Sequence, residues 1–183
     1  RVRPGIPSLR TVPIARELER SFRVARARPG FRLVHYSLQG NHAHLIVEAR
    51  DRDALGRGMK SIAARVARAV NRVANRTGPV LADRYHLRLL PTPTEVRNAL
   101  RYVLLNARHH AATAKVKLRT AARLDPASSA GWFDGWKRGS RPSPSAPEPA
   151  AGRNPAPVAR ARTWLLAIGW RRLGLLDPAD VPG

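Results

Sequence analysis

The sequence contains no cysteine, no long apolar run and few acidic residues. Without cysteine the chain forms no disulfide, no zinc ribbon and no thiol nucleophile, and a cytoplasmic location is permitted. No apolar run approaches the roughly 18 residues of a membrane-spanning helix, and no stretch has the pattern of a signal peptide. Because the chain begins at Arg1 rather than at a methionine, we expect that an N-terminal piece precedes it. These absences favour a cytoplasmic protein without a membrane partner.

The shortage of acidic residues leaves a large positive charge. The chain has 34 Lys and Arg against 12 Asp and Glu, a formal net charge of +22. Such an excess attracts polyanions, and nucleic acid is the natural partner because each neutralised phosphate releases counterions. A ribosomal-type protein, or a merely arginine-rich composition, is the alternative interpretation. The length of 183 residues suits one globular domain with an appendage.

Apolar periodicity and turn residues predict a mixture of helices and strands. The first helix has one apolar stripe, formed by Ile14, Leu18, Phe22 and Ala25. The expected elements are a helix that starts after Thr11 and ends before Pro29, strands at 31–38 and 42–49, a helix at 54–76, a strand at 85–90, and a helix from Glu95 to about His110 that Thr94 caps. This order predicts an α+β fold, with a small antiparallel sheet covered by helices as in ferredoxin-like and split βαβ folds.

The composition changes at Asp125. Serine, proline, glycine and alanine dominate from there to Val158, which predicts a flexible linker. Within it, the aromatic cluster at 132–136 is expected to dock on the main domain. Residues 160–176 predict a short terminal helix, whose apolar residues to bury are Trp164, Leu165, Ile168 and Leu173.

Two histidines, His42 and His44, open the second strand of the predicted hairpin, after the Gly40-Asn41 turn. Side chains alternate along a strand, so both imidazoles point to one face and are close enough to hold one divalent ion. Ala43, Leu45 and Val47 then line the opposite, apolar face. Two strand histidines are nevertheless more often surface or satisfied polar residues than metal ligands.

Two helices carry further candidate residues. Tyr102 and Asn106 are four residues apart and share one helical stripe, although tyrosine on a helix is usually packing. Another helix carries arginines on the side away from its apolar stripe. This run is either a solvated face or a ridge that follows nucleic-acid phosphates. Its members are Arg65, Arg68, Arg72 and Arg76.

Three segments together resemble the REP-associated tyrosine transposases, in the HUH superfamily of single-strand DNA transposases. They are QGNHAHLIVEA, with the His-hydrophobic-His motif, the basic helix GRGMKSIAARVARAVNRVANRTG, and RYHLRLLPTPTEVRNALRYVLLNARHH, with the Tyr-x-x-x-Asn spacing. The resemblance covers roughly residues 1–110. It implies that His42, His44 and Asn106 bind Mg²⁺ or Mn²⁺ and that Tyr102 is the nucleophile.

The resemblance also implies an activity and a domain organisation. A protein of this family nicks and rejoins single-stranded hairpin DNA through a covalent 5′-phosphotyrosine intermediate. Residues 1–124 would form the HUH-type catalytic domain, 125–159 the linker and 160–183 the C-terminal helix. The arginine ridge at 65–76, together with Arg88, would position the DNA backbone. The protein would act as a monomer or homodimer at the bacterial nucleoid.

The sequence departs from the family pattern at three points. Ala107 follows Asn106 where relatives often have proline, Gln39 rather than a carboxylate precedes the histidines, and the expected first strand is reduced to residues 1–3. Glu48 follows the histidines on their face of the strand and is expected to pair with an arginine rather than to support the metal. Tyr85 is a weaker candidate for a second nucleophile.

Two other functions are compatible with the same residues. The first is a non-enzymatic α+β module that binds RNA or DNA through its charge and its sheet-face aromatics. The second is a metal-dependent nuclease in which an activated water molecule attacks the phosphate and Tyr102 only packs. Tyr36, His35, His109 and His110 are expected to pack or to contact phosphate.

Overall fold

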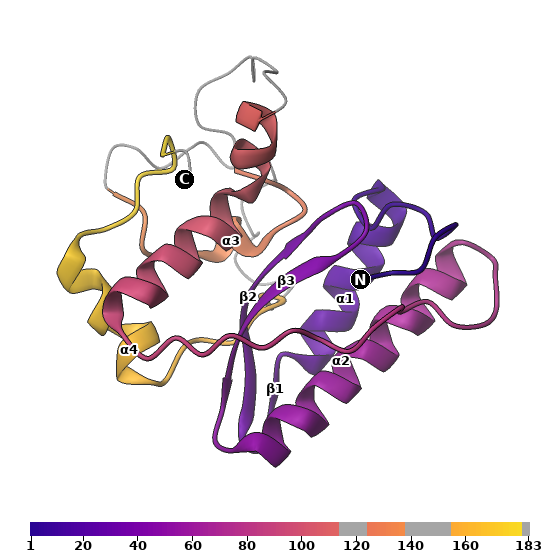
Figure 1. Ribbon diagram of the computed structural model, residues 1–183, viewed down its shortest axis with the longest axis horizontal. Coiled ribbons are helices and arrows are strands. Elements are labelled where there is room, and N and C mark those ends of the chain that lie inside the picture. Colours follow the sequence, from indigo (N-terminus) through magenta and orange to yellow (C-terminus); the bar gives the residue numbers. More distant parts are fainter. Residues whose placement is uncertain (114–123, 138–154, 181–183) are drawn as a thin grey trace.

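The computed structural model describes residues 1–113, 124–137 and 155–180 (Figure 1). Their elements, in chain order, are α1 (Val12–Ala25), β1 (Ala27–Arg28), β2 (Phe31–Leu38), β3 (Ala43–Ala49), α2 (Arg52–Val73), α3 (Pro93–Thr113), the 3₁₀ helix η1 (Ser129–Trp132), α4 (Trp164–Ala167) and the 3₁₀ helix η2 (Gly169–Leu173). Within these ranges, no helix is both long enough and apolar enough to cross a membrane.

The sheet is small and antiparallel, with strand order β1-β2-β3. Its centre is the predicted hairpin, in which Ser37 lies opposite His44 and Arg32 lies opposite Glu48. The two-residue loop of Gly40 and Asn41 is anchored from outside, because its carbonyl groups accept hydrogen bonds from the backbone N–H groups of residues 9 and 2 respectively. The α+β class is therefore confirmed, and the N-terminal segment holds the turn from which the histidines start.

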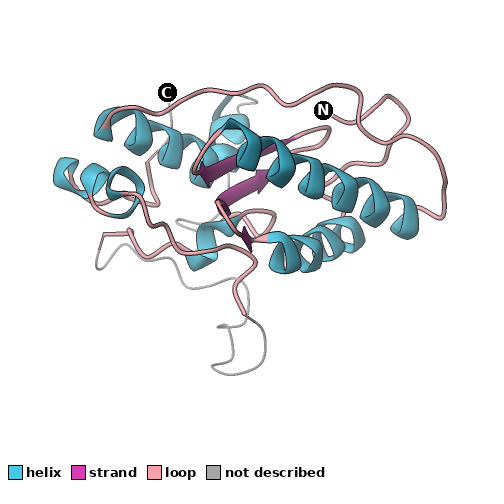
Figure 2. Cartoon of the chain, turned by 90° about the horizontal axis from the view of Figure 1, so that it is seen from below, coloured by secondary structure: helices cyan, strands magenta, loops and turns pink. Residues whose placement is uncertain are grey.

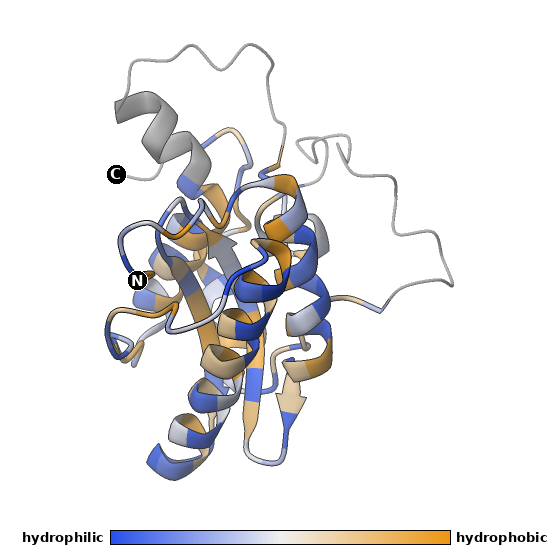
Figure 3. Ribbon diagram, turned by 90° about the vertical axis from the view of Figure 1, so that its right-hand side faces the viewer, coloured by the Kyte–Doolittle hydropathy of each residue, from blue (hydrophilic) through white to orange (hydrophobic). Residues whose placement is uncertain are grey.

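Helices α1 and α2 cover one face of the sheet, and α3 lies on the other (Figure 1). Figure 2, which views the molecule from below, shows the strands between the helices. The predicted stripe of α1 is confirmed, since all four of its residues are buried. Along α2 the apolar side also faces inward, where Ile62, Val66 and Val70 are buried, and Figure 3 shows hydrophilic and hydrophobic residues alternating along the helices. At Gly58 of α2 a Cβ atom would lie 2.3 Å from the ring of Phe31, so only glycine permits this helix–strand contact.

The face of the sheet under α3 has a second apolar core. Val34 and Ile46 of the sheet pack there against α3 and against the C-terminal residues. Two aromatic side chains from those residues, Phe133 and Trp170, stack with ring centroids 5.5 Å apart. Among the side chains of α3 that the structure describes, the buried apolar ones are Val96, Leu100, Val103, Leu104 and Leu105. Both faces of the hairpin are thus covered, which fixes the side to which each residue of β3 points.

The predicted strand at 85–90 is not formed. Residues 84–91 are outside any helix or strand, and Tyr85, Leu87 and Leu89 are exposed. The N-terminal residues pair instead with the residues just before this segment, through the Val2–Leu81 bridge and the backbone bonds on either side of it. Three N-terminal residues provide partners only for 80–82, so the alternating apolar residues beyond them have no neighbouring strand within the described ranges.

The start of α3 also differs from the prediction. The helix begins at Pro93, and Thr92 rather than Thr94 caps it. The Glu95 backbone N–H donates to the Thr92 hydroxyl at 3.2 Å, and that hydroxyl donates to the Glu95 carboxylate at 2.8 Å. This Thr-x-x-Glu arrangement is a capping-box sequence that starts two residues earlier than we expected.

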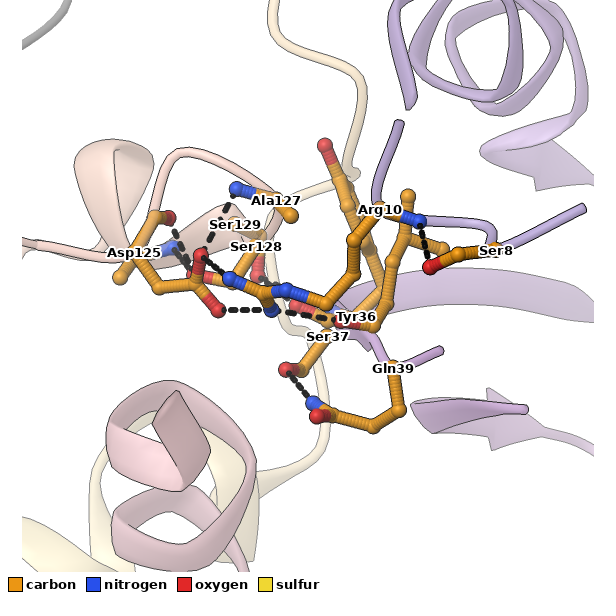
Figure 4. Close-up of polar contacts among 11 residues, drawn as sticks. Ser8, Arg10, Tyr36, Ser37, Gln39, Asp125, Ala127, Ser128 and Ser129 are labelled. Carbon is orange, nitrogen blue, oxygen red and sulfur yellow. Dashed lines mark hydrogen bonds and ion pairs between the residues drawn. The ribbon is translucent and has the colours of Figure 1, made fainter. Parts of the chain in front are cut away.

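The predicted linker is wrong for residues 125–137, which pack into the body of the protein. Asp125 is buried and forms two 2.8 Å hydrogen bonds with the guanidinium of Arg10, which also donates to the Leu38 carbonyl (Figure 4). Ser128 and Ser129 are buried against the end of β2. The predicted docking of the aromatic cluster at 132–136 is confirmed by the burial of Phe133 and Trp136. The predicted linker residues 138–154 lie outside the described ranges.

The predicted terminal helix is shorter and rotated relative to our expectation. Helix α4 ends at Ala167, and the chain continues as the 3₁₀ helix η2. The side chains that become buried are those of Leu166, Trp170 and Leu176. The expected Trp164, Ile168 and Leu173 are exposed and Leu165 is half-buried. At Gly169 a Cβ would lie 2.7 Å from the Trp164 ring, so this close approach marks the break between the helices.

The Arg10–Asp125 pair is expected to stabilise the fold, because it joins the N-terminal segment, β2 and the 124–137 segment. We expect Asp125→Asn to lower the free energy of unfolding by about 2 kcal/mol, since charged hydrogen bonds at a buried carboxylate are lost. Urea unfolding measures the change. Arg20→Ala, which removes an exposed pair with Glu17, should change it by less than about 0.5 kcal/mol. Equal effects of the two substitutions would show that the buried pair does not stabilise the fold.

Candidate active site

The two predicted metal ligands are adjacent, with His42 directly before β3 and His44 within it. His42 Nε2 and His44 Nε2 lie 3.0 Å apart, and the two rings are perpendicular with centroids 4.7 Å apart. His42 Nδ1 lies 2.8 Å from Asn41 Oδ1. With the proton on Nδ1, His42 donates to that oxygen and keeps a lone pair on Nε2. An outer hydrogen bond of this kind orients metal-binding histidines.

Tyr102 reaches this pair from α3. Its ring contacts the His44 ring edge to face, with centroids 5.0 Å apart. The tyrosine is 37% exposed, so a substrate can approach it. Its neighbours Leu100, Val103 and Leu104 are buried, which fixes the rotation of α3 and leaves Tyr102 at the edge of the helix–sheet contact. The predicted juxtaposition of the tyrosine with the histidines is therefore present.

Asn106 lies one helical turn beyond Tyr102 and is 1% exposed. Neither its amide nitrogen nor its amide oxygen has a hydrogen-bond partner among the described residues. A buried polar group without a partner costs about 1–3 kcal/mol, so such a group in a native protein calls for an explanation, of which a bound ion is one. The amide oxygen is a suitable ligand for a hard cation.

The donor atoms present fit a divalent cation. Two nitrogen ligands that bind one octahedral ion at right angles, each about 2.1 Å from it, are about 3.0 Å apart, which is the separation of the two Nε2 atoms. The unpartnered Asn106 oxygen would supply a third ligand. Within the described ranges no group of three or more His, Cys, Asp or Glu side chains could hold a metal ion, so a site here depends on the two imidazoles and the amide.

The predicted DNA-binding arginines are not part of this cluster. Arg65, Arg68, Arg72 and Arg76 lie on α2 or directly after it, on the opposite side of the sheet from α3 (Figure 1). Arg72 forms a 2.7 Å ion pair with Glu17, and Arg76 donates to Asn71 at 2.8 Å. Arg88 lies in the extended segment before α3, 3.9 Å from Glu95. The arginines at 65–76 therefore do not reach a phosphate bound beside Tyr102. A strand bound there would have to pass round the sheet to bring other phosphates to them.

Glu48 has a different partner from the arginine side chain that we expected. Its buried carboxylate accepts hydrogen bonds of 2.7–3.0 Å from the Arg162 and Thr163 backbone N–H groups and from the Thr163 hydroxyl. It thereby attaches the C-terminal segment to β3 directly before the start of α4. Tyr85 is exposed in the segment before α3 and does not join the histidines within the described contacts.

His35 and Tyr36 are packing residues of β2, as expected. Tyr36 is buried against Phe22, and burial raises the pKa of its hydroxyl. His35 is buried between Ser129 and Phe133. Burial lowers the pKa of His35 to about 4, although the carboxylate of Asp134 acts in the opposite direction. The side chains of His109 and His110 lie outside the described part of the structure.

Searches of the chain against models of protein families, curated proteins and solved structures found no match. The site is accordingly defined by its own motifs and geometry.

A second group of basic residues was not predicted from the sequence. Arg26, Arg32, Arg160 and Arg162 surround one cavity. The four come from distant parts of the chain, and the alternation of Arg160 and Arg162 along an extended segment was the only local signal for them.

Asn106 gives a direct test of the metal site. In EDTA, Asn106→Leu should raise the free energy of unfolding by about 1–2 kcal/mol, because an unpartnered amide is replaced by an apolar group of similar size. Mn²⁺ should raise the melting temperature of the wild type but not of the variant. Thermal unfolding with and without Mn²⁺ measures both effects.

The matched control is Asn71→Leu, since Asn71 donates to the Gly78 carbonyl and accepts from Arg76. This substitution should lower stability in EDTA and leave the Mn²⁺ effect intact. Destabilisation of Asn106→Leu to the same extent would show that its amide is satisfied and would contradict the assignment.

The buried His35 predicts a pH dependence of stability. With a folded-state pKa of about 4 and an unfolded value near 6.5, the unfolded state binds more protons between these values. The stability of the folded state with a neutral, buried His35 is therefore fully present above pH 6.5, and it is lost as the pH falls towards 4. Between pH 7 and 4.5 the wild type should lose about 2 kcal/mol more stability than His35→Gln. Parallel urea titrations of both proteins measure the difference, and identical pH profiles would exclude this role.

Proposed function

We propose that this protein is a metal-dependent DNA transposase of the HUH type, which nicks and rejoins single-stranded hairpin DNA through Tyr102. The observation that carries the proposal is the meeting of Tyr102 with the His42–His44 pair and, one turn along α3, a buried Asn106 without a partner among the described residues. Neither packing nor solvation accounts for all four residues. A half-exposed nucleophile beside a ligand set accounts for them together.

The reaction exchanges one phosphodiester bond for another. The Tyr102 hydroxyl oxygen attacks the phosphorus, gives up its proton, and forms a bond as the bond between phosphorus and the 3′ oxygen breaks. The protein retains the 5′ phosphate on the tyrosine, and the departing strand takes a proton to become a 3′ hydroxyl. Attack by a 3′ hydroxyl on the phosphotyrosine reverses the step and joins a strand. Hydrolysis would lose this reversibility.

The residues of the site have separate tasks in this reaction. Tyr102 provides the attacking oxygen, and the packing of α3 orients it towards the sheet. His42, His44 and Asn106 would hold Mg²⁺ or Mn²⁺. When bound, the ion would neutralise charge that develops on the non-bridging phosphate oxygens. Asn41 orients His42 through its 2.8 Å hydrogen bond.

The positive charge supports a nucleic-acid substrate. A net charge of +22 draws a polyanion to all sides of the protein. The arginines at 65–76 would contact DNA that flanks the cut, on the far side of the sheet, and Arg88 would contact the strand as it approaches α3. The protein would act in the bacterial cytoplasm, at the nucleoid, as a monomer or homodimer.

The proposal predicts a covalent product. Incubation with Mn²⁺ and a labelled hairpin single strand should give an adduct that survives SDS and carries the strand portion with the 5′ phosphate at the cut. Tyr102→Phe should abolish it, and His42→Ala should reduce it at least about 100-fold, the scale of lost metal assistance. Tyr85→Phe is the matched control, because Tyr85 is also exposed on the approach to α3, and it should leave the adduct unchanged.

Two outcomes would favour the rival functions. Cleavage that needs Mn²⁺ but survives Tyr102→Phe would indicate a nuclease that uses water. Binding of the hairpin that is insensitive to EDTA and to Tyr102→Phe, with no cut product at any metal concentration, would indicate a non-enzymatic binding module.

A further inference from the structure

A cavity of about 360 Å³ lies between the β1–β2 edge of the sheet and the segment 155–162. Four arginines and four small apolar residues surround it. This volume is within the range of ligand pockets, about 300–1,000 Å³. The lining residues are Arg26, Ala27, Arg32, Ala156, Val158, Ala159, Arg160 and Arg162.

The cavity has an excess of positive charge that the described residues do not neutralise. None of its lining residues is acidic. Arg26 donates to the carbonyl of Ala156. The guanidinium groups of Arg32, Arg160 and Arg162 form no hydrogen bond or ion pair with any residue in the described ranges, although each has up to five donors. Like charges held around one cavity repel each other, so an anion that enters it is stabilised.

Glu48 lies near these arginines, and its contacts explain how the cavity is built. It stands opposite Arg32 in the β2–β3 register, yet its carboxylate binds the backbone of residues 162 and 163. The segment is also attached to the sheet by the backbone N–H of Ala159, which donates to the Leu33 carbonyl at 2.8 Å. Glu48 therefore holds Arg160 and Arg162 in place and leaves their guanidinium groups available.

The cavity lies at the edge of the sheet. Its lining residues Ala156 and Val158 pack with the core under α1 and α2, whereas Arg32 projects to the face that carries His44. Residues opposite each other in an antiparallel pair project to one face, so Arg32 and Glu48 share a face. His44 shares it too, because Glu48 follows it by four positions, an even number, in β3. Four residues of strand span about 13 Å. Ile46, which lies between His44 and Glu48 on this face, is buried under α3. A single strand that reaches both Tyr102 and the arginine cavity would therefore pass round the helices that cover the face.

We propose that the arginine cavity binds a phosphodiester group of the substrate strand, some nucleotides away from the one that Tyr102 attacks. Arginine forks hold phosphate oxygens in pairs, and the alanine and valine side chains would contact the attached sugar or base. The proposal rests on the proposed function, because it takes the single DNA strand as the ligand. It assigns the C-terminal segment a role in holding that strand.

The test measures binding of a labelled hairpin single strand by fluorescence anisotropy, in the Tyr102→Phe background so that no adduct forms. Arg160→Gln with Arg162→Gln should weaken binding at least about tenfold, since two charged hydrogen-bond donors are lost. The slope of log K against log salt should fall in magnitude by about 1.4, or about 0.7 per lost contact. Both arginines are exposed, so the fold should remain intact.

The matched control removes the same charge elsewhere. Arg16→Gln with Arg57→Gln changes two exposed arginines of α1 and α2 that do not line the cavity. This pair should weaken binding less than about threefold, because it acts only through the general field. Equal losses of affinity and slope in the two double variants would overturn the proposal.

Neutral linkages locate the phosphate. Methylphosphonate is placed at one position of the strand at a time, and one position away from the cut should cost wild-type affinity about tenfold. The same replacement should cost the Arg160–Arg162 double variant almost nothing, because the contact is already gone. Independent, additive losses at every position would mean that no single phosphate occupies the cavity.

Two further measurements distinguish a strand site from a small-anion site and from the chemistry at Tyr102. Binding of a free mononucleotide or inorganic phosphate that requires Arg160 and Arg162, while strand binding does not, would replace the proposal with a small-anion site. The adduct assay is independent of the binding measurements. If the methylphosphonate and arginine substitutions act independently while the adduct still forms, the cavity proposal alone is wrong. If they depend on each other but no adduct forms, the transposase chemistry is wrong and strand binding by the cavity remains.

Discussion

The alternation of side chains along β3 is the constraint on which the candidate site depends. Leu45 and Val47 pack with the core under α1 and α2, whereas Ile46 packs with the core under α3. Because both layers are occupied, a register shift of one residue would move apolar side chains out of both cores. The histidines therefore face α3 for the same reason that Ile46 does. The hydrophobic effect, rather than any contact with a metal, thus sets the position of the two imidazoles.

The same arrangement has a cost in stability. Helix α3 covers the sheet with five buried apolar residues, and this burial carries Asn106 into an environment where its amide has no described partner. An apolar residue there would be more favourable for folding alone. Unsatisfied groups of this kind are expected where a site is prepared for a ligand. The Arg10–Asp125 pair and the Glu48 hydrogen bonds lie outside the site and fasten the segments that surround it.

Local patterns predicted the parts of the fold whose partners are local. The stripe of α1, the bounds of β2 and the hairpin follow from periodicity and turn residues alone. The pattern at 85–90 is equally strand-like, but a sequence does not reveal whether a neighbouring strand is present, and here the N-terminal residues reach only 80–82. Ser128, Ser129 and Ala130 suggest a linker by composition, yet small residues are what fits against the end of β2. The contact of Tyr102 with His44 was predicted only through the motif resemblance, because spacing along one helix cannot place it on a strand.

Two groups of arginines bear on the proposed function, one on α2 and one around the arginine cavity. Those on α2 are separated from Tyr102 by the sheet and its side chains, and salt screens charges that lie farther apart than about 8 Å at physiological ionic strength. Under the proposed function they could draw a polyanion to the protein but could not select the phosphodiester that is cut. On the same proposal, selection would require contacts with the same strand at a second point, and the arginine cavity at the sheet edge, with residues from the β1–β2 edge and the segment after residue 154, would supply them. These residues are far apart in the sequence, so only the fold brings them together. A strand held at the arginine cavity would be fixed in direction as well as in place, and that would decide which of its phosphates meets the tyrosine.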